Sequence, residues 1–256
     1  MEEDAAWTAL VDELDAWSSA GLTSRFWWRD DDAVECSKAL DRLTGLSQKF
    51  AAQLVLAVIP ARLQPGLVQQ VADTPHLYCA QHGLSHDNNA PPGQKKIELG
   101  GGLGAAAVID RIGRGQAILD DLMPRNHPSR LSMLVPPWNR INADVVDALP
   151  GLDFAALSCF ADQPDVELPD GLARLNVHCD PINWRDDRAY TGAATALAPI
   201  IERLKAARIG DRVTTTQIGL MTHHLVHSAE VWQFVERFLA VTTDHPAIRW
   251  RQPLEH

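Results

Sequence analysis

The sequence predicts an α/β protein whose parallel strands alternate with helices and close into a barrel. Short apolar runs alternate with amphipathic stretches of ten or more residues along the chain, which is typical of βαβ units and a parallel sheet. About seven strands within 256 residues favour a closed barrel over an open doubly wound sheet. An apolar fraction of 46% with 22% charged residues is that of a globular protein, so we expect one domain spanning 1–256.

The first twenty residues predict an amphipathic helix that precedes the barrel. Apolar side chains recur there at helical spacing, acidic residues occupy the other face, and Ala20-Gly21 ends the pattern. We interpret residues 1–21 as an N-terminal helical extension. The last three residues, 254–256, resemble the start of an expression-tag scar and are left out of the functional interpretation.

The remaining elements follow in alternation. The apolar runs that predict strands are 25–29, 53–59, 76–80, 131–135, 154–158, 172–177 and 217–221. The amphipathic stretches that predict helices are 36–50, 62–72, 105–123, 141–149, 188–207 and 229–242. Residues 87–104 are too rich in Gly and Pro for regular structure and predict a long, flexible rim loop. Because this loop lacks the spacing of phosphate-binding glycine motifs, a nucleotide site is not expected there.

The charge balance argues against a nucleic-acid partner. The 33 acidic and 23 basic residues give a formal net charge of −10, and no cluster of Lys and Arg suited to phosphates is present. No window reaches the roughly 18 consecutive apolar residues of a membrane span, and the acidic start lacks the positive region of a signal peptide. We therefore expect a cytoplasmic protein with neither a nucleic-acid nor a membrane partner.

Four widely separated cysteines predict buried free thiols. They form no C-x-x-C pair, which disfavours both a zinc knuckle and a disulfide framework. Their positions are Cys36, Cys79, Cys159 and Cys179.

Three consecutive carboxylates follow the first predicted strand. Asp30, Asp31 and Asp32 come directly after an apolar aromatic run and Arg29. Adjacent carboxylates repel one another, and a strand end that gathers them usually has a cation to offset this repulsion. The alternative is a solvated turn in which an Asp caps the next helix.

Two histidines four residues apart follow the third predicted strand. On one helical turn, His82 and His86 would bring two ring nitrogens to a single ion at about 2.0–2.1 Å. Two unrelated loop histidines are the simpler alternative. Together with the Asp run, however, the pair supplies a His-His-carboxylate set with open positions, which suits a catalytic metal that activates water.

Three later segments add polar and aromatic residues after strands. His223 follows the strand predicted at 217–221 and is a candidate general acid or base, with an ordinary core or capping histidine as the alternative. Two prolines before Trp138 fix the backbone, so this ring is either a sugar-stacking platform or a core residue. Asp180 and Trp184 follow a further strand, where the Asp either orients a histidine or forms an Asp-Pro turn.

Taken in chain order, these segments resemble the motif set of the polysaccharide deacetylase (NodB-homology) superfamily of carbohydrate esterases. The resemblance covers the chain from about residue 25 to 238 and implies an irregular (β/α)7-type barrel with the site at the carboxyl ends of the strands. In the family's first motif, T-F-D-D, the first Asp is the catalytic base and the second Asp is a metal ligand. This assigns Asp31 as the base and Asp32 as a ligand, and a one-residue shift to Asp30 and Asp31 is the alternative register.

The second motif, H-[ST]-x-x-H, assigns His82 and His86 as the remaining metal ligands. Gly83 stands where the motif has Ser or Thr. The fifth motif, an apolar run ending in L-x-H, assigns His223 as the general acid.

The third and fourth motifs are matched more loosely. Pro137-Trp138 matches R-x-P-[YW], which implies that the Trp138 backbone amide stabilises an oxyanion. Val135 replaces the motif arginine, for which Arg140 is a possible substitute, and the second Asp of D-x-x-D-W is Asn183. The residues assigned to substrate binding are Trp138, Asn139, Arg140, Asp180 and Trp184.

The resemblance implies a metal-dependent hydrolase that removes an acetyl group from an N-acetylated sugar or a related carbohydrate amide. Zn²⁺ is the expected ion, and a small molecule or an oligosaccharide is the expected substrate. The missing motif-three arginine motivates one alternative, a catalytically impaired carbohydrate-binding barrel. The other alternative is a metallohydrolase of a different amide, such as a deformylating or ring-opening enzyme.

Overall fold

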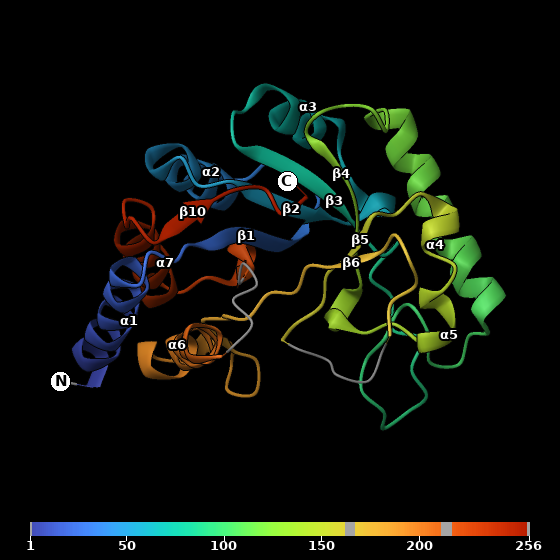
Figure 1. The fold of residues 1–256 in the computed structure, drawn as a ribbon. Helices are drawn as coiled ribbons and strands as arrows, with labels where there is room; N and C mark the ends of the chain where they lie inside the picture. Colours follow the sequence, from blue (N-terminus) through green and yellow to red (C-terminus); the bar gives the residue numbers. More distant parts are fainter. Residues whose placement is uncertain (1, 162–166, 211–216, 255–256) are drawn as a thin grey trace. The chain divides into compact units, whose positions relative to one another are not determined.

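The computed structural model describes residues 2–161, 167–210 and 217–254, in which helices and strands alternate (Figure 1). The helices are α1 (Glu2–Ser19), α2 (Lys38–Phe50), α3 (Pro65–Asp73), α4 (Ala105–Leu122), α5 (Ala143–Val146), α6 (Ala193–Ile209) and α7 (Ala229–Thr242). The strands are β1 (Ser24–Ala33), β2 (Leu54–Val58), β3 (Leu77–His82), β4 (Arg130–Val135), β5 (Ala156–Leu157), β6 (Ala173–Arg174), β7 (Ile182–Asn183), β8 (Ala189–Tyr190), β9 (Gln217–Thr222) and β10 (Ile248–Trp250). Residues 255 and 256 of the suspected tag scar lie outside the described residues.

The chain divides into two compact units. The first comprises the described residues within 1–29, 38–54 and 177–255, and the second those within 30–37 and 55–176. The division falls inside β1, between Arg29 and Asp30.

In the first unit, the N-terminal helix is part of the core. Helix α1 packs along α6 and buries Trp7, Leu10, Leu14 and Trp17. The Trp17 indole donates a hydrogen bond to the Leu204 carbonyl at 3.1 Å. Strand β1 pairs in parallel with β10, and β9 also pairs with β1. The segment predicted as an extension therefore contributes large apolar side chains to this unit.

In the second unit, parallel strands carry the residues of interest to one end. The strand order is β1-β2-β3-β4-β5-β6, with β3 and β4 in a parallel register that places His82 opposite Val135. Helix α4 covers a core cluster through Val108 and Ile112, and it also contacts α5 (Figure 1). A Cβ at Gly115 of α4 would collide with the Gln81 side chain, so glycine permits the helix to approach β3 closely.

Several predicted boundaries are wrong in an informative way. Strand β1 continues through the three aspartates, and β3 continues to His82. These polar residues therefore lie within the last residues of their strands rather than after them. Strands β5 and β6 are only two residues long, and a β7–β8 antiparallel hairpin precedes α6, which begins at Ala193 instead of 188. The predicted loop at 87–104 contains no helix or strand, only an isolated bridge between Leu99 and Ile141.

The cysteine prediction is correct for three residues and wrong for one. All four thiols are free; Cys79, Cys159 and Cys179 are buried, whereas Cys36 is exposed.

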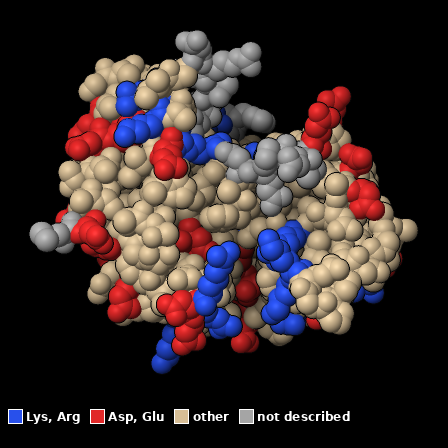
Figure 2. All heavy atoms as spheres, turned by 90° about the horizontal axis from the view of Figure 1, so that it is seen from below, with Lys and Arg blue, Asp and Glu red and all other residues tan. Residues whose placement is uncertain are grey.

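The outer surface carries charges of both signs. On the face shown in Figure 2, Lys and Arg side chains lie near Asp and Glu side chains, with uncharged surface around them. Among the described helices, none combines the length and the apolar character that crossing a membrane requires.

Candidate functional site

Three of the predicted metal ligands converge in the second unit. Asp32 Oδ1 lies 3.2 Å from His82 Nε2 and 3.2 Å from His86 Nε2, and the three ligand atoms lie within 4.8 Å of one another. No other set of three His, Cys, Asp or Glu side chains in the described part of the chain is arranged in this way. Asp32, rather than Asp31, therefore holds the place next to the histidines.

His82 is held by the neighbouring strand. Its side chain is buried at the end of β3, and its Nδ1 lies 2.9 Å from the carbonyl oxygen of Val135 in β4. A hydrogen on Nδ1 donates to that carbonyl and leaves the Nε2 lone pair directed towards Asp32. This is the second contact by which proteins orient a ligating histidine and select its tautomer.

His86 reaches the same place by a loop and not by a helical turn, so that expectation was wrong. After β3 ends, Gly83 and His86 both adopt left-handed backbone conformations, with φ of +59° and +61°. The His86 ring lies with its centroid 5.2 Å from the His82 ring and 4.2 Å from the Trp138 ring. Burial lowers the pKa of His86, against the raising effect of the Asp32 charge, which favours the neutral imidazole that binds metals.

Positive φ angles recur at the site residues. Asp32 has φ of +70° and Trp138 has φ of +55°, in addition to His86 at +61°. Such conformations cost non-glycine residues about 1–3 kcal/mol each and cluster at functional sites. Residues elsewhere, such as Ala51 and His76, also have positive φ, but two of the three converging ligands share this costly conformation, which is a second indication of a functional site.

Trp138 lies beside His86 on the 3₁₀ turn η2 (Pro137–Asn139) that follows β4. The Lys96 ammonium lies 5.9 Å from the centre of its indole ring. No described residue accepts a hydrogen bond from the backbone N–H of Trp138. The turn thus presents one backbone donor and one aromatic face next to the candidate ligands.

The neighbours of Trp138 are engaged locally. The Asn139 N–H donates to the Pro136 carbonyl at 2.9 Å. Arg140 Nη1 donates to the Lys96 carbonyl at 2.8 Å. Arg140 therefore anchors the loop at 87–104.

The first unit holds a separate group of predicted residues. The Trp184 indole N–H donates to Asp180 Oδ2 at 2.7 Å, and its ring meets the His223 ring edge-on, with centroids 4.6 Å apart. Asp180 Oδ1 also accepts the Ile182 N–H at 3.0 Å, and the His223 N–H donates to His227 Nε2 at 3.3 Å. Asp180 thus forms the Asp-Pro turn and holds the Trp184 indole, and it is the indole ring that contacts His223.

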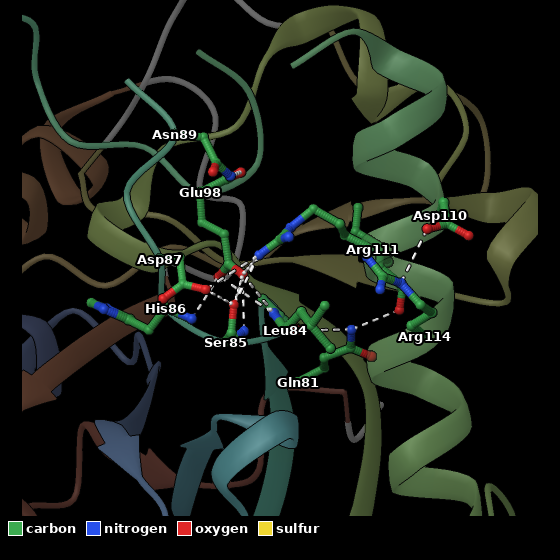
Figure 3. Close-up of polar contacts among 12 residues, drawn as sticks. Gln81, Leu84, Ser85, His86, Asp87, Asn89, Glu98, Asp110, Arg111 and Arg114 are labelled. Carbon is green, nitrogen blue, oxygen red and sulfur yellow. Dashed lines mark hydrogen bonds and ion pairs between the residues drawn. The ribbon is translucent and has the colours of Figure 1, made fainter. Parts of the chain in front are cut away.

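Glu98 is the residue that sequence reasoning missed. It is fully buried and accepts hydrogen bonds from the N–H groups of Leu84, Ser85 and His86, and Arg111 pairs with it at 3.1 Å (Figure 3). The available signal was its position between two apolar residues inside an otherwise polar loop. A charged residue in such a place is buried only when it is paired.

Comparisons with known proteins give the fold. No family model matches the sequence, and no curated protein matches it. A putative polysaccharide deacetylase from Mycobacterium smegmatis matches with a TM-score of 0.66 and 17% identity, over 90% of this chain and 87% of that chain. An allantoinase matches with a TM-score of 0.58 and 10% identity, over 89% and 87% of the two chains. A restored-activity mutant of a CE4 family pseudoenzyme matches with a TM-score of 0.54 and 11% identity, over 89% of this chain and 65% of that one.

The chain therefore has the fold of the polysaccharide deacetylases. This confirms the predicted irregular (β/α)7-type barrel.

Proposed function

We propose that the protein is a metal-dependent hydrolase that removes an acetyl group from an N-acetylated sugar or a related carbohydrate amide. The observation that carries this proposal is the convergence of Asp32, His82 and His86 in a chain with the deacetylase fold. Two imidazoles and one carboxylate form a ligand set of catalytic metal sites and leave positions open for water and substrate. Zn²⁺ is the proposed ion because it readily accepts this combination of ligands.

The donor atoms fit such an ion. His82 has its Nδ1 engaged by the Val135 carbonyl, so its Nε2 is the atom left to bind, and the lowered pKa of His86 favours the neutral ring. When bound, the ion would polarise the acyl carbonyl and lower the pKa of a water molecule. Holding the ion is thus the role we assign to Asp32, His82 and His86.

The remaining roles belong to groups of the chain itself. Asp31, which is buried and adjacent to Asp32, accepts the proton of the attacking water. The Trp138 N–H, which no described residue engages, donates to the oxyanion that develops on the acyl oxygen. His223 protonates the leaving nitrogen, an assignment that rests on its sequence motif.

Aromatic and polar side chains are proposed to bind the sugar. Trp138 and the half-exposed Trp184 offer faces on which a sugar ring can stack, and Asp180 is held in place by the Trp184 indole. Asn139 and Arg140 flank the Trp138 platform and are proposed to contact substrate hydroxyls. The partner is therefore a small molecule or an oligosaccharide, without nucleic acid or membrane.

Metal content and acetate release test the proposal together. Purified protein loaded with Zn²⁺ or Co²⁺ should retain about one ion per chain by elemental analysis, and Asp32→Ala should lose it. Asp31→Asn should keep the ion and lose roughly 10²–10⁴-fold of the acetate release from N-acetylated sugars. Asp110→Asn, at an exposed ion pair with Arg114 on α4, is the matched control and should change neither. Absence of stoichiometric metal in the wild type, or full activity in Asp31→Asn, would contradict the proposal.

A second candidate is a metallohydrolase that acts on a different amide. The match to an allantoinase at a TM-score of 0.58 favours it, because the same fold carries that enzyme. Ring opening of a cyclic amide, or formate release, in place of acetate release would support this candidate.

A third candidate is a carbohydrate-binding barrel that has lost turnover. It is favoured by Val135 at the motif-three arginine position and by the match to a CE4 family pseudoenzyme. Measurable sugar binding without acetate release across a panel of N-acetylated sugars would support it.

A further inference from the structure

We infer that Glu98 is a positioning residue that holds His86 in the conformation in which it can bind a metal. The inference rests on the metal site proposed above. Between the two histidines, the chain must turn sharply for two side chains four residues apart to face one ion.

The loop wraps its backbone donors around one carboxylate. The Ser85 N–H donates to Glu98 Oε1 at 2.9 Å, the His86 N–H donates to Oε2 at 3.1 Å, and the Leu84 N–H lies 3.2 and 3.3 Å from the two oxygens. Figure 3 shows these donors converging on Glu98 from the segment that carries His86. Successive N–H groups in a loop with left-handed residues form a concave anion site, and here a side chain of the same protein occupies it.

The negative charge of Glu98 is balanced inside the protein. Arg111 of α4 lies 3.1 Å from Glu98 Oε1 and donates to the Ser85 hydroxyl at 2.8 Å. A fully buried carboxylate is stable only when paired and hydrogen-bonded, and Glu98 meets both conditions. The arrangement thus connects α4, through one ion pair, to the loop that carries His86.

Gly83 leaves open the space that the Glu98 carboxylate occupies. A Cβ at this position would collide with Glu98 Oε2 and lie 2.8 Å from Pro137 Cγ. The position that holds Ser or Thr in the motif therefore has no room here for a side chain, since the Glu98 carboxylate takes that space. Glu98 and Gly83 together account for the departure from the motif.

Removal of the Glu98 charge should weaken metal binding without touching a ligand. In Glu98→Gln the side chain keeps one acceptor oxygen and turns an NH₂ group towards the remaining loop N–H groups, so part of the contact that fixes His86 at its left-handed φ is lost. Loss of a contact that orients a ligand typically lowers metal affinity by about 10–100-fold.

The experiment compares Glu98→Gln with Glu13→Gln in the full chain. Glu13 is also buried and also pairs with an arginine, Arg208 at 2.7 Å, but it lies on α1 in the first unit. Both variants should lower the urea midpoint of unfolding. Co²⁺ titration below the unfolding transition should show at least a tenfold loss of affinity and an altered visible spectrum for Glu98→Gln only.

The outcomes separate this inference from the proposed function. If wild-type protein binds no Co²⁺, the proposed metal site fails. If the wild type binds Co²⁺ and folded Glu98→Gln binds it within twofold of the wild type, the positioning role is overturned and the metal site stands. If Glu98→Gln does not fold, Arg111→Met decides: a tenfold or greater loss of Co²⁺ affinity supports the role, and an unchanged affinity overturns it.

Discussion

Single residues at the candidate site occupy backbone conformations that their side chains disfavour. Asp32, His86 and Trp138 all have positive φ, at about 1–3 kcal/mol each. For His86 the compensation is visible, because its N–H and those of the two preceding residues bind one buried carboxylate. Local strain is thus offset by contacts from residues that are distant along the chain.

Gly83→Ala tests the space beside Glu98. The alanine would be held at an unfavourable positive φ, and its Cβ would collide with the Glu98 carboxylate. We therefore expect a loss of about 2–5 kcal/mol in the free energy of unfolding. Gly93→Ala is the control, since Gly93 has φ of +80° and no atom near its would-be Cβ. Its loss should stay near 1–2 kcal/mol. Equal losses in urea unfolding for the two variants would show that backbone strain alone matters.

Thiol reactivity should distinguish the four cysteines. Burial raises the pKa of Cys79 to about 12, and burial also raises the pKa of Cys179, whereas Cys36 is exposed. With this pKa, the thiolate fraction of Cys79 at pH 8 is about 10⁻⁴. The thiolate is the form that reacts, so Cys79 should react slowly. A disulfide reagent should therefore modify one thiol quickly in the native protein and four after denaturation. Cys36→Ser should abolish the fast phase; a second fast thiol in the native protein would contradict this expectation.

At the scale of elements, long periodic segments were predictable and short ones were not. The stretches 105–123 and 229–242 became α4 and α7 almost unchanged, because an apolar face repeats over several turns. Strand β10 has three residues and β5 has two, too few for any periodicity to appear. The hairpin of β7 and β8 escaped prediction for the same reason.

The polar ends of β1 and β3 were missed for a different reason. Asp is rare in strands, so a sequence pattern ends the strand before Asp30, but pairing with neighbouring backbone continues to Ala33. His82 is likewise retained in β3 by its pairing with Val135. The candidate ligands could be named from the sequence because their types and spacing are specific. Glu98 could not be assigned, since its role depends on a loop closure 12 to 14 residues away.

Trp17→Ala tests whether α1 is part of the first unit's core. Trp17 is fully buried against α6 and donates to the Leu204 carbonyl, so its truncation should cost about 3–5 kcal/mol. Trp184→Ala removes an indole that is 47% exposed and should cost less than about 1 kcal/mol. Urea unfolding of both variants gives the comparison. A cost below about 1 kcal/mol for Trp17→Ala would mean that α1 is a dispensable extension.

At the scale of the whole molecule, metal binding should stabilise the folded chain by mass action. An ion at 100 times its dissociation constant adds about 2.7 kcal/mol. For a chain of this length that corresponds to a rise of roughly 5–10 °C in Tm. Differential scanning calorimetry with and without Zn²⁺ should show this rise for the wild type and not for His82→Ala. An equal rise in His82→Ala would place the binding elsewhere in the chain.

The division of the chain also limits how the candidate site can be moved. The sequence passes between the two units at 29/30, 37/38, 54/55 and 176/177. The long continuous piece, 55–176, contains His82, His86, Glu98 and Arg111, whereas Asp32 belongs to the short segment 30–37 that first-unit sequence flanks on both sides. A recombination or grafting event that exchanges only the long piece would transfer two ligands with their supporting ion pair and leave the third behind. The site is therefore inherited only with the end of β1, which ties exchange of this chemistry between proteins to a segment that runs at least from Asp32 to Arg111 and includes the first-unit residues 38–54.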